Sequence, residues 1–398
     1  MLAMKRISHT HENTLSDFLS SKGWFEKKCI SCGNRLFTKK RLGQSQENCE
    51  RSKCSNNGNT FLKLSRRSRM LTIPMINDQI ESFFKKNHFS RKDPMPMVNP
   101  NSKTDVIMAG VQILDGVIHG NDDVDNGRIF ISQPSMRMQY QSLVKEFEGT
   151  STSFVNICTE HMDATIENHL AYIDLWLTAL SLLGLHMNDF KLVMRMSNKD
   201  WGTGAISSLE LFFVYCDIEL GDAAFAFIPH RDNKNLVISD IGFGLERIAW
   251  AVNKTPSYFD QIRPLSQTLP REYLDTCRSL SLLALTGIQA KNKGPGFQFR
   301  RFAKVLAIKY PSSCHAGVLE YYFSYWSQFI EPLVSLPAAM FAVNSEIGRL
   351  RNSRLADSFK ESALENESTE DYLLRLFLAR NATIDEIEVA LKHERANT

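Results

Sequence analysis

Residues 239–252 read SDIGFGLERIAWAV, and this stretch decides the fold because a strand pattern passes directly into a helix pattern. Glycines at 242 and 244 allow the backbone to turn tightly before a helix that begins near Leu245, which puts Arg247 in the first helical turn. Asp240 before the turn and Arg247 after it could bracket a zwitterionic or phosphate-bearing ligand. An ordinary capped helix start explains the same residues, so other motifs must decide.

Strand-like runs dominate the sequence on the N-terminal side of this stretch, and they are rich in β-branched and aromatic residues. No regular alternation of strand and helix supports a parallel doubly wound sheet, so we expect a mostly antiparallel sheet in an α+β fold. We also expect a short helix at about 15–28, a long one at about 163–184, and helices almost throughout after Pro264. The expected strands are 106–114, 128–133, 192–196, 208–220, 223–228 and 236–244.

The length of 398 residues suits two or three domains. The composition is that of a globular protein, since 43% of the residues are hydrophobic and 23% are charged. No stretch approaches the ~18 consecutive apolar residues of a membrane span, and the N-terminus lacks the apolar region of an export signal. We therefore expect a cytoplasmic protein with no membrane partner. Its eight cysteines should stay reduced, which favours metal binding over disulfides.

Positive charge is concentrated at the N-terminus. Residues 1–70 contain 15 Lys and Arg against 5 Asp and Glu, whereas the net charge of the whole chain is only +3. This pattern is expected of a module that binds a polyanion, although a solubilising surface has the same composition.

Four cysteines form two close pairs within this basic segment. Cys29 and Cys32 lie in CISC, and Cys49 and Cys54 lie in CERSKC, with sixteen residues between Cys32 and Cys49. Two such pairs suit tetrahedral Zn²⁺, because each pair can form a knuckle and the loop between them lets the pairs face each other. Four unrelated thiols are the alternative. With no open coordination position, the predicted Zn²⁺ site would be structural.

A further candidate is ISQPSMRMQ at 131–139, which has the pattern of a strand that carries Arg137 and is followed by polar residues as far as Gly149. An arginine that projects from a sheet below a hairpin loop is well placed to neutralise a phosphate with two parallel hydrogen bonds. A surface arginine is the alternative for this residue taken alone.

Taken together and in order, these segments resemble the archaeal-type alanyl-tRNA synthetases of class II. The cysteine pairs are similar to the family's N-terminal extension, ISQPSMRM to its motif 2, and SDIGFGLERIAW to its motif 3, whose usual form is Asp-Thr-Gly-(Tyr/Met)-Gly-Leu-Glu-Arg. Motif 3 and the block at 291–301 are the specific matches. The remaining similar segments are VIMAGVQIL (106–114), IELGDAAFAF (218–227), DTCRSLSLLALTG (275–287) and KNKGPGFQFRR (291–301).

The resemblance implies an antiparallel class II catalytic domain that activates an amino acid with ATP and transfers it to the 3′ end of tRNA. It implies three domains, namely a basic zinc-binding module at 1–64, an adenylation domain at 65–262 and a helical tRNA-recognition domain at 263–398. ATP and Mg²⁺ are implied as cofactors beside Zn²⁺, and the tRNA acceptor stem is implied as a partner.

The resemblance also assigns roles to individual residues. Arg137 would stabilise the charge that develops at the α-phosphate, and Arg247 would hold the terminal phosphates together with Mg²⁺. Asp240 would accept the α-ammonium of the substrate, and Gly242 belongs to the same substrate-binding motif. Trp201 would form a wall on the amino-acid side of the pocket.

Several positions near the implied ligand depart from the family pattern. Ile241 replaces the usual Thr of motif 3, and Asp222 stands at a substrate-binding position where the family has a small neutral polar residue. The pocket segment 200–210 lacks the family's glycine-proline pattern, and residues 153–154 and 158–159 replace its Arg-His and Phe-Glu pairs. These changes favour a paralogue with altered substrate preference or reduced activity, with neutral drift as the alternative.

In the helical region, Asn292 matches the family residue that contacts the acceptor stem of tRNA, and Arg300 and Arg301 lie close to it in sequence. Basic side chains beside a loop suit phosphate contacts, whereas an amide can recognise a base edge. The sequence shows no His-x3-His motif with a later Cys and His, so no zinc-dependent editing site is expected.

Three functions remain open at this point. The first is ligation of alanine or another small amino acid to tRNA without editing, the second is adenylation followed by transfer to a carrier protein, peptide or small molecule, and the third is an inactive RNA-binding regulatory module. Retention of Arg137, Asp240 and Arg247 argues against the inactive module, whereas the changed pocket argues against the housekeeping enzyme.

Overall fold

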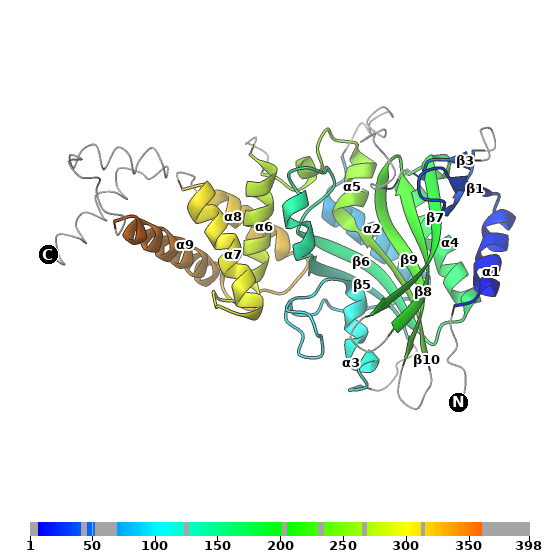
Figure 1. Cartoon of the computed structure of the whole chain (residues 1–398), viewed down its shortest axis with the longest axis horizontal. Coiled ribbons are helices and arrows are strands. Elements are labelled where there is room, and N and C mark those ends of the chain that lie inside the picture. The colour runs from blue at the N-terminus through cyan, green and yellow to red at the C-terminus, as the bar shows by residue number, and fades with distance from the viewer. Residues whose placement is uncertain are drawn as a thin grey trace. The chain divides into compact units, whose positions relative to one another are not determined.

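A ten-stranded, mostly antiparallel sheet organises the N-terminal part of the protein in the residues that the structure describes (Figure 1). The computed structural model describes residues 7–40, 46–49, 51, 70–122, 127–200, 205–229, 235–264, 269–311 and 315–359. The chain divides into two units, Met1–Arg263 and Pro264–Thr398. Among the described residues, no helix combines the length and apolar character needed to cross a lipid bilayer.

The order of strands in the sheet is β3-β1-β2-β7-β8-β9-β10-β6-β5-β4. Neighbouring strands are antiparallel except for the β1–β3 and β4–β5 pairs at the two edges. The expected antiparallel α+β fold is therefore confirmed. The strands are β1 (Phe25–Cys29), β2 (Arg35–Thr38), β3 (Gln46–Glu47), β4 (Ser90–Arg91), β5 (Arg128–Met136), β6 (Ser153–Met162), β7 (Phe190–Asp200), β8 (Ala205–Tyr215), β9 (Ile218–Pro229) and β10 (Asn235–Gly244).

Two helices, α2 and α4, cover one face of the sheet through aromatic side chains. Trp176 of α4 lies 4.5 Å from Phe243 of β10, measured between ring centroids, and its indole N–H donates to Thr159 of β6. Phe84 of α2 stacks on Phe130 of β5. The helical elements of this unit are α1 (His9–Ser21), α2 (Ile73–Lys86), η2 (Gly110–Leu114), α3 (Asp115–Ile118), η3 (Met138–Leu143), α4 (Ile166–Leu182), η4 (Met187–Asp189), α5 (Leu245–Asn253) and η6 (Tyr258–Gln261).

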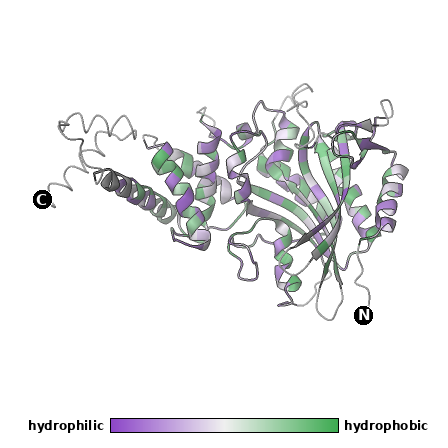
Figure 2. Cartoon of the chain, viewed as in Figure 1, coloured by the Kyte–Doolittle hydropathy of each residue, from purple (hydrophilic) through white to green (hydrophobic). Residues whose placement is uncertain are grey.

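Because side chains alternate along a strand, the residues next to Phe243 on β10 point to the opposite face of the sheet. This second face carries Asp240, Gly242 and Gly244. Hydrophobic residues follow the central strands and the helices packed on them, whereas α1 is largely hydrophilic (Figure 2).

The run at 106–114, expected as a strand, is instead a loop followed by the 3-10 helix η2, so that expectation was wrong. Gln112 ends the extended backbone, because its side-chain oxygen accepts from the Met108 and Ala109 N–H groups. Gly110 lies against β6, where a Cβ would come within 2.1 Å of the Cys158 sulfur. The segment therefore packs across the sheet and does not pair with a strand.

The helix expected at 15–28 is also shifted. It ends at Ser21, and Gly23 then takes a left-handed conformation with φ 75° that an ordinary side chain adopts only with strain. Residues 25–29 form β1, in which Lys27 and Cys29 are buried while Lys28 is exposed. The two-residue period of a strand thus replaces the helix that the apolar residues predicted.

The cysteine-bearing segment continues the main sheet. Leu36 of β2 pairs with Val193 of β7. Glu47 of β3 forms ion pairs with Lys27 at 2.7 Å and with Lys191 of β7 at 2.9 Å. These contacts attach the segment to the edge of the sheet, on the side where β7 and β8 lie.

The second unit is helical, as expected after Pro264. Its described part consists of four helices, and Arg278 of α6 is buried against α8, with its guanidinium 4.4 Å from the Trp326 ring centroid and 4.5 Å from that of Tyr325. The Trp326 indole N–H donates to the Arg278 carbonyl. The helices are α6 (Arg271–Leu285), α7 (Gly294–Lys309), α8 (Ala316–Trp326) and α9 (Leu336–Phe359).

Candidate functional site

A cavity of about 900 Å³ lies over the second face of the sheet. Strands β8, β9 and β10 supply Phe212, Asp222 and Asp240 to its wall. The start of α5 contributes Arg247, and the residue that follows β5 is Arg137. The structure thus brings together residues that are separated by more than 100 positions in the sequence. Of the residues predicted for this site, Arg137, Asp222, Asp240, Gly242 and Arg247 line the cavity, whereas Trp201 lies outside the described residues.

Arg137 is held by one nitrogen and presents the rest of its guanidinium. Its Nε–H donates to the Met108 carbonyl at 3.0 Å, and the guanidinium lies 5.0 Å from the ring centroid of Phe154. Its terminal nitrogens make no hydrogen bond or ion pair with another described residue. Arg137 is therefore oriented by the backbone and offers its outer N–H groups to an anion in the cavity.

Arg247 is anchored to the backbone at two points. Its Nε–H donates to the Gly149 carbonyl at 2.7 Å and its Nη1 to the Glu219 carbonyl at 2.9 Å. The helix that carries it begins at Leu245, as predicted. Glu246 fixes this helix start, because both of its carboxylate oxygens accept from the Val155 N–H at 3.0 Å. Arg247 is thereby preorganised at the wall of the cavity.

Three carboxyl groups lie on neighbouring strands of the same face. Asp240 is opposite Glu160 on β6, and Asp222 on β9 is opposite Gly242, two residues from Asp240. Diagonal neighbours of this kind are about 7–8 Å apart between Cα atoms. The two aspartates therefore face the same part of the cavity, and Glu160 lies beside Asp240.

Burial and mutual repulsion perturb these acids. Burial, followed by the neighbouring Asp240 carboxylate, raises the pKa of Glu160 well above its usual range. Burial, followed by the carboxylates of Asp240, Glu219 and Glu210, raises the pKa of Asp222 to about 7. The side chain of Cys158 opposes the shift at Glu160 only in part, so burial next to Asp240 disfavours the anion of Glu160.

Gly242 lies on a crowded part of the cavity floor. A Cβ at this position would come within 3.1 Å of the Asn156 amide nitrogen. Asn156 is itself fixed, since its side-chain oxygen accepts from the Gly110 N–H and its amide donates to the Phe243 carbonyl. A side chain at 242 would therefore displace the amide that connects β6, β10 and η2.

Several cavity residues were not predicted from the sequence. Phe212 lies between two arginines, with the Arg51 guanidinium 3.6 Å and the Arg195 guanidinium 4.8 Å from its ring centroid. Arg51 forms an ion pair with Glu219 at 2.8 Å. The basic N-terminal segment was the available signal for Arg51, and it was interpreted as a polyanion-binding surface. No local pattern marks Glu160, because the partners that perturb it come from other strands.

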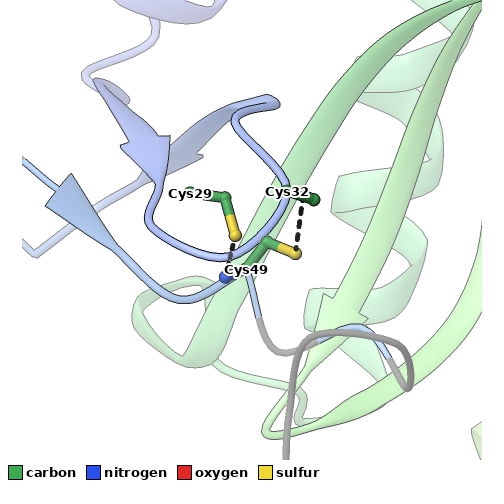
Figure 3. Close-up of side chains that lie close together, drawn as sticks. All are labelled: Cys29, Cys32 and Cys49. Atoms are coloured by element: carbon green, nitrogen blue, oxygen red, sulfur yellow. Dashed lines mark hydrogen bonds between the residues drawn. The ribbon is translucent and has the colours of Figure 1, made fainter.

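Three of the four predicted zinc ligands meet in the structure (Figure 3). The sulfur atoms of Cys29, Cys32 and Cys49 all lie within 4.8 Å of one another, and the Cys32 and Cys49 sulfurs are 3.9 Å apart. Sulfurs bound to one tetrahedral Zn²⁺ at about 2.3 Å would be separated by about 3.8 Å, so these residues fit the ion. Cys54 lies outside the described residues.

The surroundings of Cys29 favour the thiolate that a metal requires. Burial raises the pKa of this thiol, but the backbone N–H groups of Cys32, Cys49 and Ser31 more than offset the effect and bring the pKa to about 6. The Cys49 N–H donates to the Cys29 sulfur at 3.4 Å. A sulfur that accepts backbone N–H bonds in this way is typical of a metal knuckle.

We expect one Zn²⁺ per chain in purified protein, and we expect Cys32→Ser to lose it, because the substitution removes one of the converging sulfurs. Elemental analysis measures both. Cys216→Ser is the matched control, since Cys216 lies outside this cluster and should leave the metal content unchanged. A full complement of metal in Cys32→Ser would contradict the assignment.

In the helical unit, Asn292 and Arg300 contact each other, since Nη1 of Arg300 donates to the Asn292 side-chain oxygen. Arg300 also forms an ion pair with Glu346 of α9 at 2.9 Å. Arg301 is exposed at the next position of α7, as are Lys291 and Lys293 in the preceding loop. Of the residues predicted to bind RNA, Asn292 and Arg301 are thus exposed, whereas Arg300 is half-buried and holds the Asn292 side chain.

The sequence is similar to curated alanine–tRNA ligases of archaea. It is 24% identical over 268 residues to that of Picrophilus torridus and 28% identical over 280 residues to that of Thermoplasma acidophilum. These alignments cover 62% and 64% of the chain, and each covers 30% of the relative. The chain therefore spans less than a third of the length of the curated relatives it matches.

A comparison with family models found no match. Among solved structures, a pyrrolysyl-tRNA synthetase from Desulfitobacterium hafniense aligns with a TM-score of 0.36 and 14% identity, covering 50% of this chain and 75% of that one. The similarity to archaeal alanyl-tRNA synthetases indicated by the motifs is thus confirmed by sequence comparison over about three fifths of the chain.

Proposed function

We propose that this protein activates alanine or another small amino acid with ATP in the cytoplasm and transfers the aminoacyl group to tRNA. The observation that carries the proposal is the cavity itself, in which Arg137 and Arg247 supply positive charge and Asp240 supplies a carboxylate over one face of the sheet. Adenylation needs these two kinds of group together, because its substrates are a polyphosphate and a zwitterion. The similarity to alanine–tRNA ligases supports the same reaction.

In the first step a carboxylate oxygen of the amino acid attacks the α-phosphorus of ATP. A new P–O bond forms, the bond to the β-phosphate breaks, and pyrophosphate leaves. Two anions approach each other, so catalysis requires fixed positive charge at the phosphorus. Arg137 would supply it through its outer N–H groups, and Arg247, already held at Gly149 and Glu219, would bind the terminal phosphates.

Mg²⁺ would enter with the nucleotide and neutralise phosphate charge. Carboxylate oxygens are its preferred protein ligands, and Glu219 carries such oxygens at the cavity wall. Zn²⁺ at the cysteine cluster would have a structural role, as its thiolates lie outside the set of residues that line the cavity.

Asp240 would accept the α-ammonium group, which distinguishes an amino acid from a simple carboxylic acid. Burial and the Asp240 carboxylate both disfavour a second negative charge on the neighbouring Glu160. Asp222 adds a second acid, whose pKa of about 7 lets the ammonium ion shift it toward the charged form. The departure from the family at Asp222 thus strengthens the binding of a cationic group.

In the second step a ribose hydroxyl at the 3′ end of tRNA would attack the adenylate carbonyl and release AMP. Arg301, with Lys291 and Lys293, would contact phosphates, and Asn292 would read a base edge of the acceptor stem. Arg300 would orient that amide through its hydrogen bond to the Asn292 oxygen.

The test is amino-acid-dependent exchange of pyrophosphate into ATP, measured for all twenty amino acids, followed by charging of total tRNA. We expect exchange with one or a few small amino acids and esterification of tRNA. Exchange without charging, with transfer to a carrier protein or small molecule in the absence of tRNA, would overturn the choice of acceptor. No exchange with any amino acid would support an inactive RNA-binding protein.

Asn292→Ala should reduce tRNA charging by about tenfold or more while leaving pyrophosphate exchange unchanged, because a base-edge contact contributes roughly 1–3 kcal/mol. Charging and exchange are measured on the same preparation. Gln328→Ala is the control, because Gln328 is an exposed residue of the same unit whose side chain donates to the Ser324 carbonyl. Binding of tRNA should also weaken steeply with salt. Unaltered charging by Asn292→Ala would contradict this interface.

A further inference from the structure

One residue of the basic N-terminal segment reaches the cavity from the cysteine cluster. Arg51 follows Cys49 by two positions, and it is one of the residues that line the cavity. We propose that Arg51 is a positioning residue, which holds Glu219 and through it Arg247, so that metal binding at the cysteines organises the ATP end of the site. The inference rests on the proposed binding of ATP in this cavity.

The Arg51 side chain is fixed by two different interactions. Its Nε–H donates to a Glu219 carboxylate oxygen at 2.8 Å, and its planar guanidinium lies 3.6 Å from the ring centroid of Phe212. Only 19% of the Arg51 side chain and 30% of the Glu219 side chain are exposed. A guanidinium that both stacks on a ring and pairs with a carboxylate is held in one orientation. The side chains of a flexible surface ion pair are not fixed in this way.

Glu219 connects this contact to Arg247. The main-chain oxygen of Glu219 accepts from Nη1 of Arg247 at 2.9 Å, while its side chain is held by Arg51. The β8–β9 pairing is irregular at this point, because Phe213 pairs with Gly221 and Val214 with Glu219, which leaves Leu220 as an extra residue. Such a bulge loses ladder hydrogen bonds and re-aims the local backbone. A side-chain anchor at Glu219 therefore fixes a carbonyl that the sheet holds weakly.

The position of Arg51 depends in turn on Cys49. The segment before it is held by Lys191, whose ammonium donates to the Asn48 carbonyl at 2.9 Å, and by the Cys49 N–H bond to the Cys29 sulfur. Two residues span at most about 7 Å, so fixing Cys49 restricts the place of Arg51 closely. A metal bound by Cys29, Cys32 and Cys49 would fix that residue more firmly than packing alone.

The first arm of the test compares single variants of the metal-loaded protein. Arg51→Ala should raise the KM for ATP in pyrophosphate exchange, and the Kd for ATP by calorimetry, by about tenfold. The kcat, the KM for the amino acid and the zinc content should change little. The KM and Kd for ATP of Arg51→Lys should lie between those of the parent and those of Arg51→Ala, because an ammonium group keeps the charge but lacks the planar fork of a guanidinium.

Arg35→Ala is the matched control. Arg35 lies in the same segment and pairs with Glu26 at 2.7 Å, but it does not line the cavity. A purely structural role for Arg51 predicts equal, small effects of Arg51→Ala and Arg35→Ala on ATP binding, since ion pairs of this exposure contribute little to folding. That result would overturn the inference.

The second arm asks whether the cysteines act through Arg51. Cys32→Ser, which should lose the metal, is expected to weaken ATP binding as Arg51→Ala does, and the double variant should show no further loss. If the losses of ATP binding caused by the two substitutions add fully in the double variant, the cysteines do not act through Arg51. If Cys32→Ser does not fold, the metal is removed from the parent and from Arg51→Ala by dialysis against a chelator before ATP and Mg²⁺ are added, and the two losses should again be non-additive.

These outcomes separate the inference from the proposed function. If no amino acid supports exchange but ATP binds and responds to Arg51→Ala, the ligase proposal fails and the positioning role stands. Normal exchange in the parent protein with no response to Arg51→Ala removes the positioning role alone. Undetectable ATP binding in the parent protein overturns both.

Discussion

Arg137→Ala is expected to abolish adenylate formation, with a loss of at least about 100-fold in the rate of pyrophosphate exchange. A preorganised charged donor that meets developing negative charge contributes about 3 kcal/mol or more to the transition state. Arg137 satisfies this condition because the Met108 carbonyl orients its Nε–H while its terminal nitrogens stay available to the cavity. Its stacking on Phe154 restricts the guanidinium further.

The loss should appear in kcat, since the charge grows only as phosphorus gains its fifth ligand. Arg128→Ala is the control, because this arginine lies at the other end of the same strand, beside Phe89, and does not line the cavity. The melting temperature of both variants should stay close to that of the parent. Near-normal exchange by Arg137→Ala would show that Arg137 plays no part in the chemistry.

Asp240→Asn should raise the KM for the amino acid by about 100-fold, with a smaller effect on the KM for ATP. The substitution keeps the shape of the side chain but removes the charge that faces the α-ammonium group, and loss of one member of a buried charge pair costs about 2–5 kcal/mol. Burial is the largest cause of the raised pKa of Glu160, and it persists in this variant, so it still disfavours a replacement charge on Glu160.

The pH dependence provides a second measurement for this variant. The pKa of Asp222 is raised to about 7, so in the parent protein the KM for the amino acid should rise as pH falls through that value and the carboxylate is protonated. Removing the Asp240 charge should move this transition to lower pH, because that charge is the second-largest cause of the raised pKa. Asp174→Asn, which alters an exposed ion pair with Lys22, should change neither quantity. An unchanged KM in Asp240→Asn would place the ammonium elsewhere.

The positions that depart from the alanyl-tRNA synthetase pattern include Asp222, which lines the cavity. Asp222 lies diagonally across from Asp240, at the proposed amino-acid end. The phosphate end keeps Arg137 and Arg247 with their backbone anchors. We therefore expect altered amino-acid preference in a protein that still forms an adenylate.

Local sequence patterns were sufficient to predict several elements of the structure. The passage from β10 into α5 at Leu245 follows from glycines at a strand end and apolar residues at helical spacing, both of which act within a few residues. The long helix α4 and the hairpin of β5 and β6 were predictable for the same reason. Paired cysteines likewise predicted a cluster, since their spacing suits a single ion.

Other features depend on contacts between segments far apart in sequence. The apolar run at 106–114 has the composition of a strand, yet Gly110 packs against Cys158 and Gln112 caps the backbone, so the run becomes a 3-10 helix across the sheet. The sequence by itself also left the cysteine-bearing segment as a separate module, whereas pairing of Leu36 with Val193 attaches it to the sheet.

The sequence alone therefore predicted the antiparallel fold, a cluster of cysteines and the charged residues Arg137, Asp240 and Arg247 that line the cavity, because propensity, periodicity and motif spacing are local properties. Only the tertiary structure decided that Glu160 is buried beside Asp240, which raises its pKa, and that Arg51 lines the cavity. Burial and charge repulsion are properties of strand register and sheet order, which bring together residues that no short window contains.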